Sequence, residues 1–246
     1  MAEFRHYILT RFNAHLYEPE VQVKISREAW MDHRLRLFMS LTLPSIAGQS
    51  CQDFTWLLLM DRRTPERYLR ALQGTGYRNL RLVYFDPERP AWLDDLPGGS
   101  HDLITTRIDN DDAFHRDAVR AIQDAWRERQ ARQAKPWLIV FPFGMILDLG
   151  DRKMWVMEYW FNNCPTLVED SHDAATVYHW QHSEIPQEVA RCHIKDQPYW
   201  LQVVHSQNLL NTIHSNNPLR IVHEELPGKI GLLWHFGIDP GGLPMA

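Results

Sequence analysis

Three aspartates lie within four positions of the stretch TTRIDNDDAF, residues 105–114. Asp109, Asp111 and Asp112 follow an apolar-leaning run, and ionised carboxylates at this spacing repel one another and raise one another's pKa. Either water or a cation relieves such repulsion. Carboxylate oxygens at the end of a strand can hold Mg²⁺ or Mn²⁺, which prefer hard oxygen ligands and share their shell with substrate phosphates. The alternative is helix capping, in which Asp111 or Asp112 begins the next helix.

The elements that would position these aspartates alternate between strand-like and helix-like segments. Short continuous apolar runs predict buried strands, and apolar residues at helical spacing predict helices. We expect strands at 6–12, 54–60, 80–85, 102–108, 137–143 and 153–160, and helices at 26–41, 64–73 and 112–131, the first two capped by Ser26 and Thr64. This alternation predicts an α/β fold with a largely parallel central sheet flanked by helices. Residues 87–99 are expected to form a loop.

Polar residues follow each of the first four predicted strands. Thr10 and Arg11 end the first strand, Asp61 follows the second, Asp86 the third and Asp109 the fourth. Any one of them is also a good turn or capping residue. Because ligands of an open parallel sheet bind at the carboxyl ends of its strands, the set predicts a rim that faces one ligand.

Composition excludes several classes of protein. The formal net charge is −5 and no long basic run is present, which argues against nucleic acid as the main partner. Three cysteines without CxxC spacing argue against a disulfide framework or a cysteine-based zinc site and suit a reducing compartment. Neither a signal peptide nor a transmembrane segment of about 18–20 apolar residues is visible. We expect a cytoplasmic protein, with peripheral attachment at the inner membrane face left open.

Four stretches resemble one known family. RIDNDD after a strand resembles the DxD element of GT-A glycosyltransferases, which use nucleotide sugars and have a Rossmann-like fold. HYILTRFN, LTLPSIAGQSCQDFTWLLLMDRRTP, ITTRIDNDDAF and YWLQVVHSQN together resemble the bacterial rhamnosyltransferase family over about residues 6–212. The resemblance implies one GT-A-like domain over residues 1–246. Its nucleotide-binding half would cover about 1–112, and its acceptor half about 113–246, with a flexible C-terminal tail.

The resemblance also implies a donor site. Thr10, Arg11 and Asp61 would line the nucleotide pocket, Asp61 accepting hydrogen bonds from a pyrimidine edge or the ribose. Arg107 would approach the diphosphate, and Asp109 would reach the donor through a bridging cation. The implied donor is a dTDP-, UDP- or GDP-sugar.

A divalent cation, Mn²⁺ or Mg²⁺, is the implied cofactor. Asp109 and Asp111 would hold it, and Asp112 would be a further ligand or a partner of one. GT-A enzymes often add a late histidine as a ligand, and His205 fits this role better than His235, although a structural histidine in a loop is an equal alternative. Such a cation stabilises the charge that develops on the departing nucleoside diphosphate.

An inverting transfer also needs a general base for the acceptor hydroxyl. The stretch TLVEDSHDA, residues 166–174, offers Glu169 and Asp170 as candidates, with His172 and Asp173 beside them. The alternative is a capping cluster before a helix, and a retaining transfer needs no such base.

The predicted function is metal-dependent transfer of a sugar, with rhamnose as the candidate, from a nucleotide-diphosphate donor to a hydroxyl of a glycan, lipid-linked or protein acceptor. A metal-dependent phosphohydrolase is one alternative, although it normally gathers its ligands from separate strands rather than from one contiguous cluster. A non-catalytic nucleotide-binding module is the other.

Overall fold

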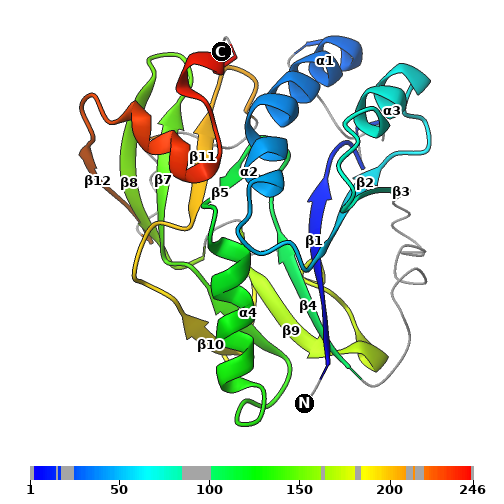
Figure 1. Ribbon diagram of the computed structural model, residues 1–246, viewed down its shortest axis with the longest axis vertical. Helices are drawn as coiled ribbons and strands as arrows, with labels where there is room; N and C mark the ends of the chain where they lie inside the picture. The colour runs from blue at the N-terminus through cyan, green and yellow to red at the C-terminus, as the bar shows by residue number, and fades with distance from the viewer. Residues whose placement is uncertain are drawn as a thin grey trace.

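The computed structural model describes residues 3–14, 16–17, 25–84, 101–161, 164–180, 184–208, 213 and 219–244. These residues form two β-sheets with helices packed against them (Figure 1). Asp86 and the predicted loop 87–99 lie outside the described residues.

The larger sheet has seven strands in the order β10-β6-β9-β4-β1-β2-β3. Four of its six neighbouring pairs are parallel, and the antiparallel ones are the two pairs that β9 makes with β4 and β6. The predicted α/β fold with a largely parallel sheet is therefore confirmed. The strands are β1 (Phe4–Arg11), β2 (Thr55–Met60), β3 (Leu80–Tyr84), β4 (Asp102–Arg107), β6 (Trp137–Val140), β9 (Thr166–Asp170) and β10 (Ala190–His193).

The smaller sheet was not predicted. It has five strands in the order β12-β8-β7-β11-β5, of which only β7 and β11 pair in parallel. The predicted strand 137–143 is split between the two sheets, because Pro142 has no N–H to donate to a ladder and the chain crosses there from β6 to β7. The strands are β5 (Ala113–Phe114), β7 (Phe143–Asp148), β8 (Lys153–Tyr159), β11 (Trp200–Val204) and β12 (Arg220–Glu225).

The helices agree with prediction near the amino terminus. The predicted helix 26–41 is observed as α1 (Arg27–Leu37), which continues through a π-helical turn, η1 (Phe38–Thr42), into α2 (Leu43–Ala47). Ser26 caps α1 as predicted, accepting a hydrogen bond of 3.2 Å from Ala29 N. Pro65 rather than Thr64 occupies the N-cap position of α3 (Glu66–Gln73) and makes no side-chain capping bond, while the Thr64 hydroxyl donates to Asp61 O. Later in the described part of the chain lie the 3₁₀ helices η3 (Ser171–Asp173), η4 (Ile230–Phe236) and η5 (Pro240–Gly242).

The predicted helix 112–131 begins six residues later than expected. Ala113 and Phe114 pair with β11 as the short strand β5, and α4 (Ala118–Arg129) has Asp117 at its N-cap. The prediction was wrong here because Phe114 continues the apolar spacing of the helix although it lies on a strand. Neither Asp111 nor Asp112 therefore caps this helix.

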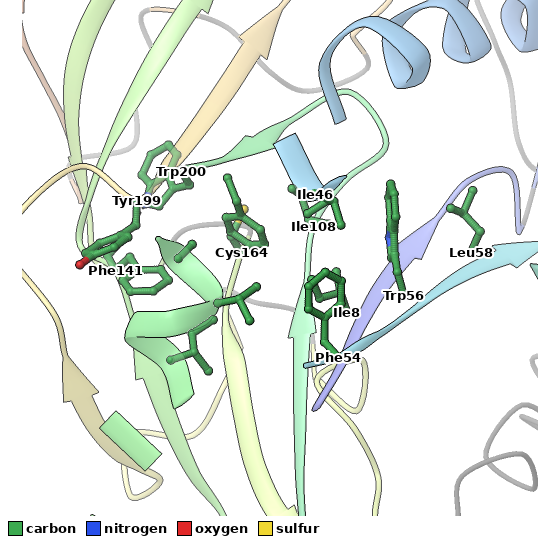
Figure 2. Close-up of a cluster of buried hydrophobic side chains, with 14 of the residues drawn as sticks. Ile8, Ile46, Phe54, Trp56, Leu58, Ile108, Phe141, Cys164, Tyr199 and Trp200 are labelled. Atoms are coloured by element: carbon green, nitrogen blue, oxygen red, sulfur yellow. The ribbon is translucent and has the colours of Figure 1, made fainter. Parts of the chain in front are cut away.

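One core joins the two sheets. Figure 2 shows it running from Ile8 and Trp56 in the larger sheet to Trp200 in the smaller one. The helices α1, α2 and α4 pack on this face, and residues 174–180 and 184–189 cover the opposite face of the larger sheet.

A second cluster lies under η4. It includes Ile238 and Leu243, which are 1% and 7% exposed, so residues of the tail predicted to be flexible are packed here. Among the described residues, no helix is long and apolar enough to cross a membrane.

Candidate functional site

The candidate site lies at the carboxyl edge of the larger sheet. Strands β1 and β4 run in parallel with Leu9 opposite Arg107, so Arg11 and Asp109 come to the same edge. In Figure 1, α1 and α3 lie near the top, at the end toward which the β1 arrow points. This is where the sequence predicted a ligand.

Two arginines stack on one tyrosine at this edge. The guanidinium carbon of Arg11 lies 4.9 Å from the centre of the Tyr178 ring, and that of Arg107 lies 5.5 Å from it. The ring is held by its hydroxyl, which donates to Leu9 O at 3.3 Å. The structure thus brings together two predicted donor-site residues through a tyrosine that the sequence reasoning missed.

The two arginines differ in their charge partners. Arg107 is buried and donates to Asp109 from Nη2 at 3.2 Å; burial alone would lower the pKa of Arg107, but the negative charge of Asp109 holds it raised. Arg11 is half-buried, and its guanidinium has no carboxylate partner among the residues that the structure describes. Among the described residues, one positive charge at this edge therefore has no carboxylate partner.

Asp111 is buried in a set of polar side chains. Its Oδ2 forms an ion pair with Arg34 Nη1, and it accepts hydrogen bonds from His205 Nε2 at 2.9 Å and from Asn208 Nδ2 at 3.4 Å. Burial would raise the pKa of Asp111, but the charge of Arg34 and the bond from His205 lower it to about 2. This carboxylate is therefore ionised, and its Oδ2 has three partners.

A second histidine extends this set. His33, one residue before Arg34 on α1, lies with its Nε2 at 3.2 Å from His205 Nδ1. Burial, followed by the neighbouring His205 and Arg34, lowers the pKa of His33 to about 4. His33 is therefore neutral near pH 7 and acts as a hydrogen-bonding partner rather than a charge.

Asp112 and Asn110 have structural partners. Asp112 is 0% exposed, and its Oδ1 accepts from Val203 N at 3.0 Å in β11. Asn110 donates from Nδ2 to Phe12 O at 2.6 Å and accepts from Arg34 at 3.1 Å. Both residues tie the segment after β4 to neighbouring elements.

Two predicted nucleotide-binding residues are already engaged. Thr10 is 0% exposed on the core face of β1, where its Oγ1 accepts from Trp56 Nε1 at 3.0 Å. Asp61 is buried, and Arg63 donates to its carboxylate from Nε at 2.9 Å and Nη2 at 2.7 Å. Both side chains therefore have partners within the protein, and their predicted place in the nucleotide pocket stays a prediction.

The predicted general bases lie at the other end of the sheet. Strand β9 is antiparallel to β4, with Asp170 opposite Asp102 and Glu169 opposite Leu103. Along β4, the five residue steps from Asp102 to Arg107 span about 17 Å at ~3.3 Å per residue. The structure therefore does not bring Glu169 and Asp170 together with Asp109.

Both acidic side chains have local partners there. Glu169 accepts from the backbone N–H groups of Ala175 and Thr176 at 3.0 and 2.9 Å, and burial raises its pKa although these two bonds oppose the shift. Asp170 pairs with Lys135 at 2.7 Å. These contacts fit the capping alternative that the sequence left open.

The two candidate histidines separate in space. His205 reaches Asp111, whereas the ring of His235 stacks on that of His115 with centroids 5.7 Å apart. His205, ranked above His235 as a metal ligand, is the one that lies beside Asp111, and its role as a ligand stays a prediction.

Two of the predicted metal ligands already have partners at one carboxylate oxygen each. Arg34 and two further donors occupy Oδ2 of Asp111, Val203 N occupies Oδ1 of Asp112, and His205 donates toward Asp111. Within the described ranges, no three His, Cys, Asp or Glu side chains gather in an arrangement that could hold a metal ion. The identity of a cofactor, Mn²⁺ or Mg²⁺, stays a prediction.

Sequence reasoning missed Arg34, although one signal was available. Arg34 lies three residues after Met31 and four before Phe38, on the apolar face of the predicted helix. An arginine on a core-facing stripe requires a buried counter-charge. No comparable signal in the sequence identifies Tyr178.

Comparisons with known proteins complete the description of the site. No curated protein matches the chain. Among solved structures, S. aureus TarS residues 1–349 with UDP aligns at 12% identity and a TM-score of 0.44, covering 82% of this chain and 60% of that one. The same TarS fragment in complex with UDP-GlcNAc aligns at 12% identity and a TM-score of 0.46, covering 84% of this chain and 60% of that one. The chain thus spans about 60% of the length of these TarS structures.

A third structure is a 4-diphosphocytidyl-2C-methyl-D-erythritol synthase from Anaerococcus prevotii. It aligns at 15% identity and a TM-score of 0.38, covering 78% of this chain and 87% of that one. The family model described as "Putative rhamnosyl transferase" matches residues 9–217, most of the chain, and the protein therefore belongs to that family.

Proposed function

We propose that this protein transfers a sugar from a nucleoside diphosphate sugar to an acceptor hydroxyl, with rhamnose, the sugar named by its family, as the transferred group. The observation that carries the proposal is the stacking of Arg11 and Arg107 on Tyr178 beside Asp109. The site lies at the carboxyl edge of a parallel sheet, where ligands of such sheets bind.

The charges at this edge suit a diphosphate. Guanidinium groups present a planar fork of donors that matches phosphate oxygens, and stacking on Tyr178 fixes the orientation of both forks. Arg11 has no carboxylate partner among the described side chains, so it can pair with an anion without breaking an existing ion pair. Donors that are already oriented stabilise the charge that develops on a departing diphosphate.

The donor nucleotide and acceptor are proposed as classes. A dTDP-, UDP- or GDP-sugar supplies the diphosphate, and a glycan, a lipid-linked sugar or a protein supplies the hydroxyl. Glu169 and Asp170 have no part in this proposal because they lie at the opposite end of β4.

Isothermal titration calorimetry with UDP, dTDP and GDP tests the donor site. We expect one of the three to bind, and Arg11→Gln to weaken that binding about tenfold or more through the loss of a charge-assisted contact. Arg5→Gln is the matched control, because Arg5 is exposed on the same strand at its other end. The proposal fails if none of the three nucleotides binds.

The transfer itself is tested with dTDP-rhamnose. We expect release of dTDP from this donor in the presence of acceptor extracts, and loss of that release in Arg11→Gln. Release of inorganic phosphate from simple phosphoesters would instead favour a phosphohydrolase.

A further inference from the structure

The aspartates after β4 already have cationic or hydrogen-bonding partners. Asp109 pairs with Arg107 and Asp111 with Arg34, while the buried Asp112 accepts from a backbone N–H. The repulsion expected between the carboxylates is therefore relieved by groups of the chain itself.

Arg34 is fixed in this position from several directions. Its Nη1 donates to Asn110 Oδ1 at 3.1 Å as well as pairing with Asp111, and its guanidinium carbon lies 5.1 Å from the centre of the Trp30 ring. The side chains of Arg34 and Asp111 are 8% and 5% exposed. A guanidinium held in this way is a built-in counter-charge rather than a mobile surface contact.

A divalent cation at Oδ2 of Asp111 would have to displace this arginine. Arg34 would then be buried without a counter-charge, which is strongly unfavourable. The remaining donors to Asp111, from His205 and Asn208, would also lose their acceptor. Oδ2 of Asp111 is consequently unavailable as a metal ligand while α1 keeps its place.

We propose that Arg34 takes the position of the divalent cation at the aspartate cluster, so that Arg11 and Arg107 bind the donor diphosphate without Mn²⁺ or Mg²⁺. This inference rests on the proposed function. It assigns to three guanidinium groups the charge compensation that a metal ion would otherwise supply.

Calorimetry of the intact protein tests the inference directly. UDP, dTDP and GDP are titrated in EDTA and, separately, in Mn²⁺ or Mg²⁺. We expect the Kd of the nucleotide that binds to agree within about twofold between these conditions. Binding that is about tenfold tighter with either metal overturns the inference and leaves the proposed function standing. If no nucleotide binds under any condition, the proposed function fails and the inference fails with it.

Substitution of Arg34 gives an independent readout that needs no nucleotide. Arg34→Gln leaves the carboxylates of Asp109 and Asp111 with one cation fewer, so Mn²⁺ alone should raise the Tm of this variant above its value in EDTA. The wild type and Arg34→Lys keep a cation at this position, so each should have the same Tm in Mn²⁺ as in EDTA. The control Arg36→Gln should behave likewise, because Arg36 is exposed on the same helix. A rise in the wild type as large as that in Arg34→Gln overturns the inference.

Discussion

Arg34 Nη1 on α1 and Asp111 Oδ2 after β4 form a buried ion pair between residues 77 positions apart in the sequence. The pair fastens the first helix of the chain to the segment that carries the aspartates. In this structure Asp111 is the counter-charge of a buried arginine, and its role as a metal ligand stays a prediction.

Removal of this counter-charge should destabilise the fold. Asp111→Ala leaves Arg34 buried and unpaired, which we expect to lower the free energy of unfolding by about 3–5 kcal/mol. Urea unfolding monitored by circular dichroism measures the loss. Asp151→Ala, at an exposed position in the turn after β7, should change stability by less than about 0.5 kcal/mol. Equal stability of Asp111→Ala and the wild type would show that the pair is dispensable.

Burial of His6 should make the protein sensitive to mild acid. Its Nε2 lies 2.9 Å from Thr106 Oγ1 in the core, and burial lowers the pKa of His6 to about 3. Between this pKa and the ordinary histidine pKa of 6.5, His6 is protonated in the unfolded chain but not in the folded one. The free energy of unfolding therefore decreases as the pH falls below 6.5. The loss is about 1.4 kcal/mol per pH unit for this one group.

Unfolding in urea at pH 7.5 and pH 5 checks this dependence. His6→Gln should show a shallower loss between the two pH values, by about 2 kcal/mol. His172→Gln is the matched control because His172 is exposed. The same loss in His6→Gln as in the wild type would exclude His6 as its source. His33, whose pKa is lowered to about 4, adds a loss in the same direction.

Gly144 should tolerate no side chain. It lies opposite Trp200 in the pairing of β7 with β11, and a Cβ atom there would overlap the indole ring. We expect Gly144→Ala to lower the free energy of unfolding by about 1–3 kcal/mol or more. Gly231→Ala, where a Cβ would meet nothing within 4 Å, should be nearly neutral in the same urea titration. Two variants of equal stability would contradict the packing described for Gly144.

Tyr178 should act on nucleotide binding through its ring. Tyr178→Ala removes the surface on which Arg11 and Arg107 stack, so the affinity for the bound nucleoside diphosphate should fall about tenfold. Tyr178→Phe keeps the ring and loses the hydrogen bonds of the hydroxyl, among them the one to Leu9 O, so calorimetry should find nearly unchanged affinity and a stability loss of about 1 kcal/mol. Equal weakening in both variants would assign the effect to the hydroxyl instead.

The sequence predicts the elements that carry strong local patterns. Strand β2 is a continuous apolar run, and Ser26 is a good cap at the start of α1, so both were located correctly. The start of α4 was predicted wrongly because Phe114 fits helical spacing while it pairs with Trp200 across the smaller sheet. Pairing between strands far apart in the chain leaves no periodic signature at short range.

Some residues of the candidate site could be predicted from the sequence, and others could not. Arg11 and Asp109 were placed at one edge because strand ends of a parallel sheet meet there, and Arg107 was added from the family resemblance. The contacts of Arg34 and Tyr178 with that edge depend on how α1 and residues 174–180 pack, which no local pattern records. The antiparallel direction of β9 likewise moved Glu169 to the far end of the sheet.

The contact between His33 and His205 joins residues 172 positions apart. Because contacts between such distant residues form only after the intervening chain has been ordered, the Asp111 pocket should be among the last parts of the molecule to assemble. During refolding, recovery of secondary structure should therefore precede recovery of nucleotide binding. Affinity for the donor would then report complete folding of the chain, from its first helix to the end of β11.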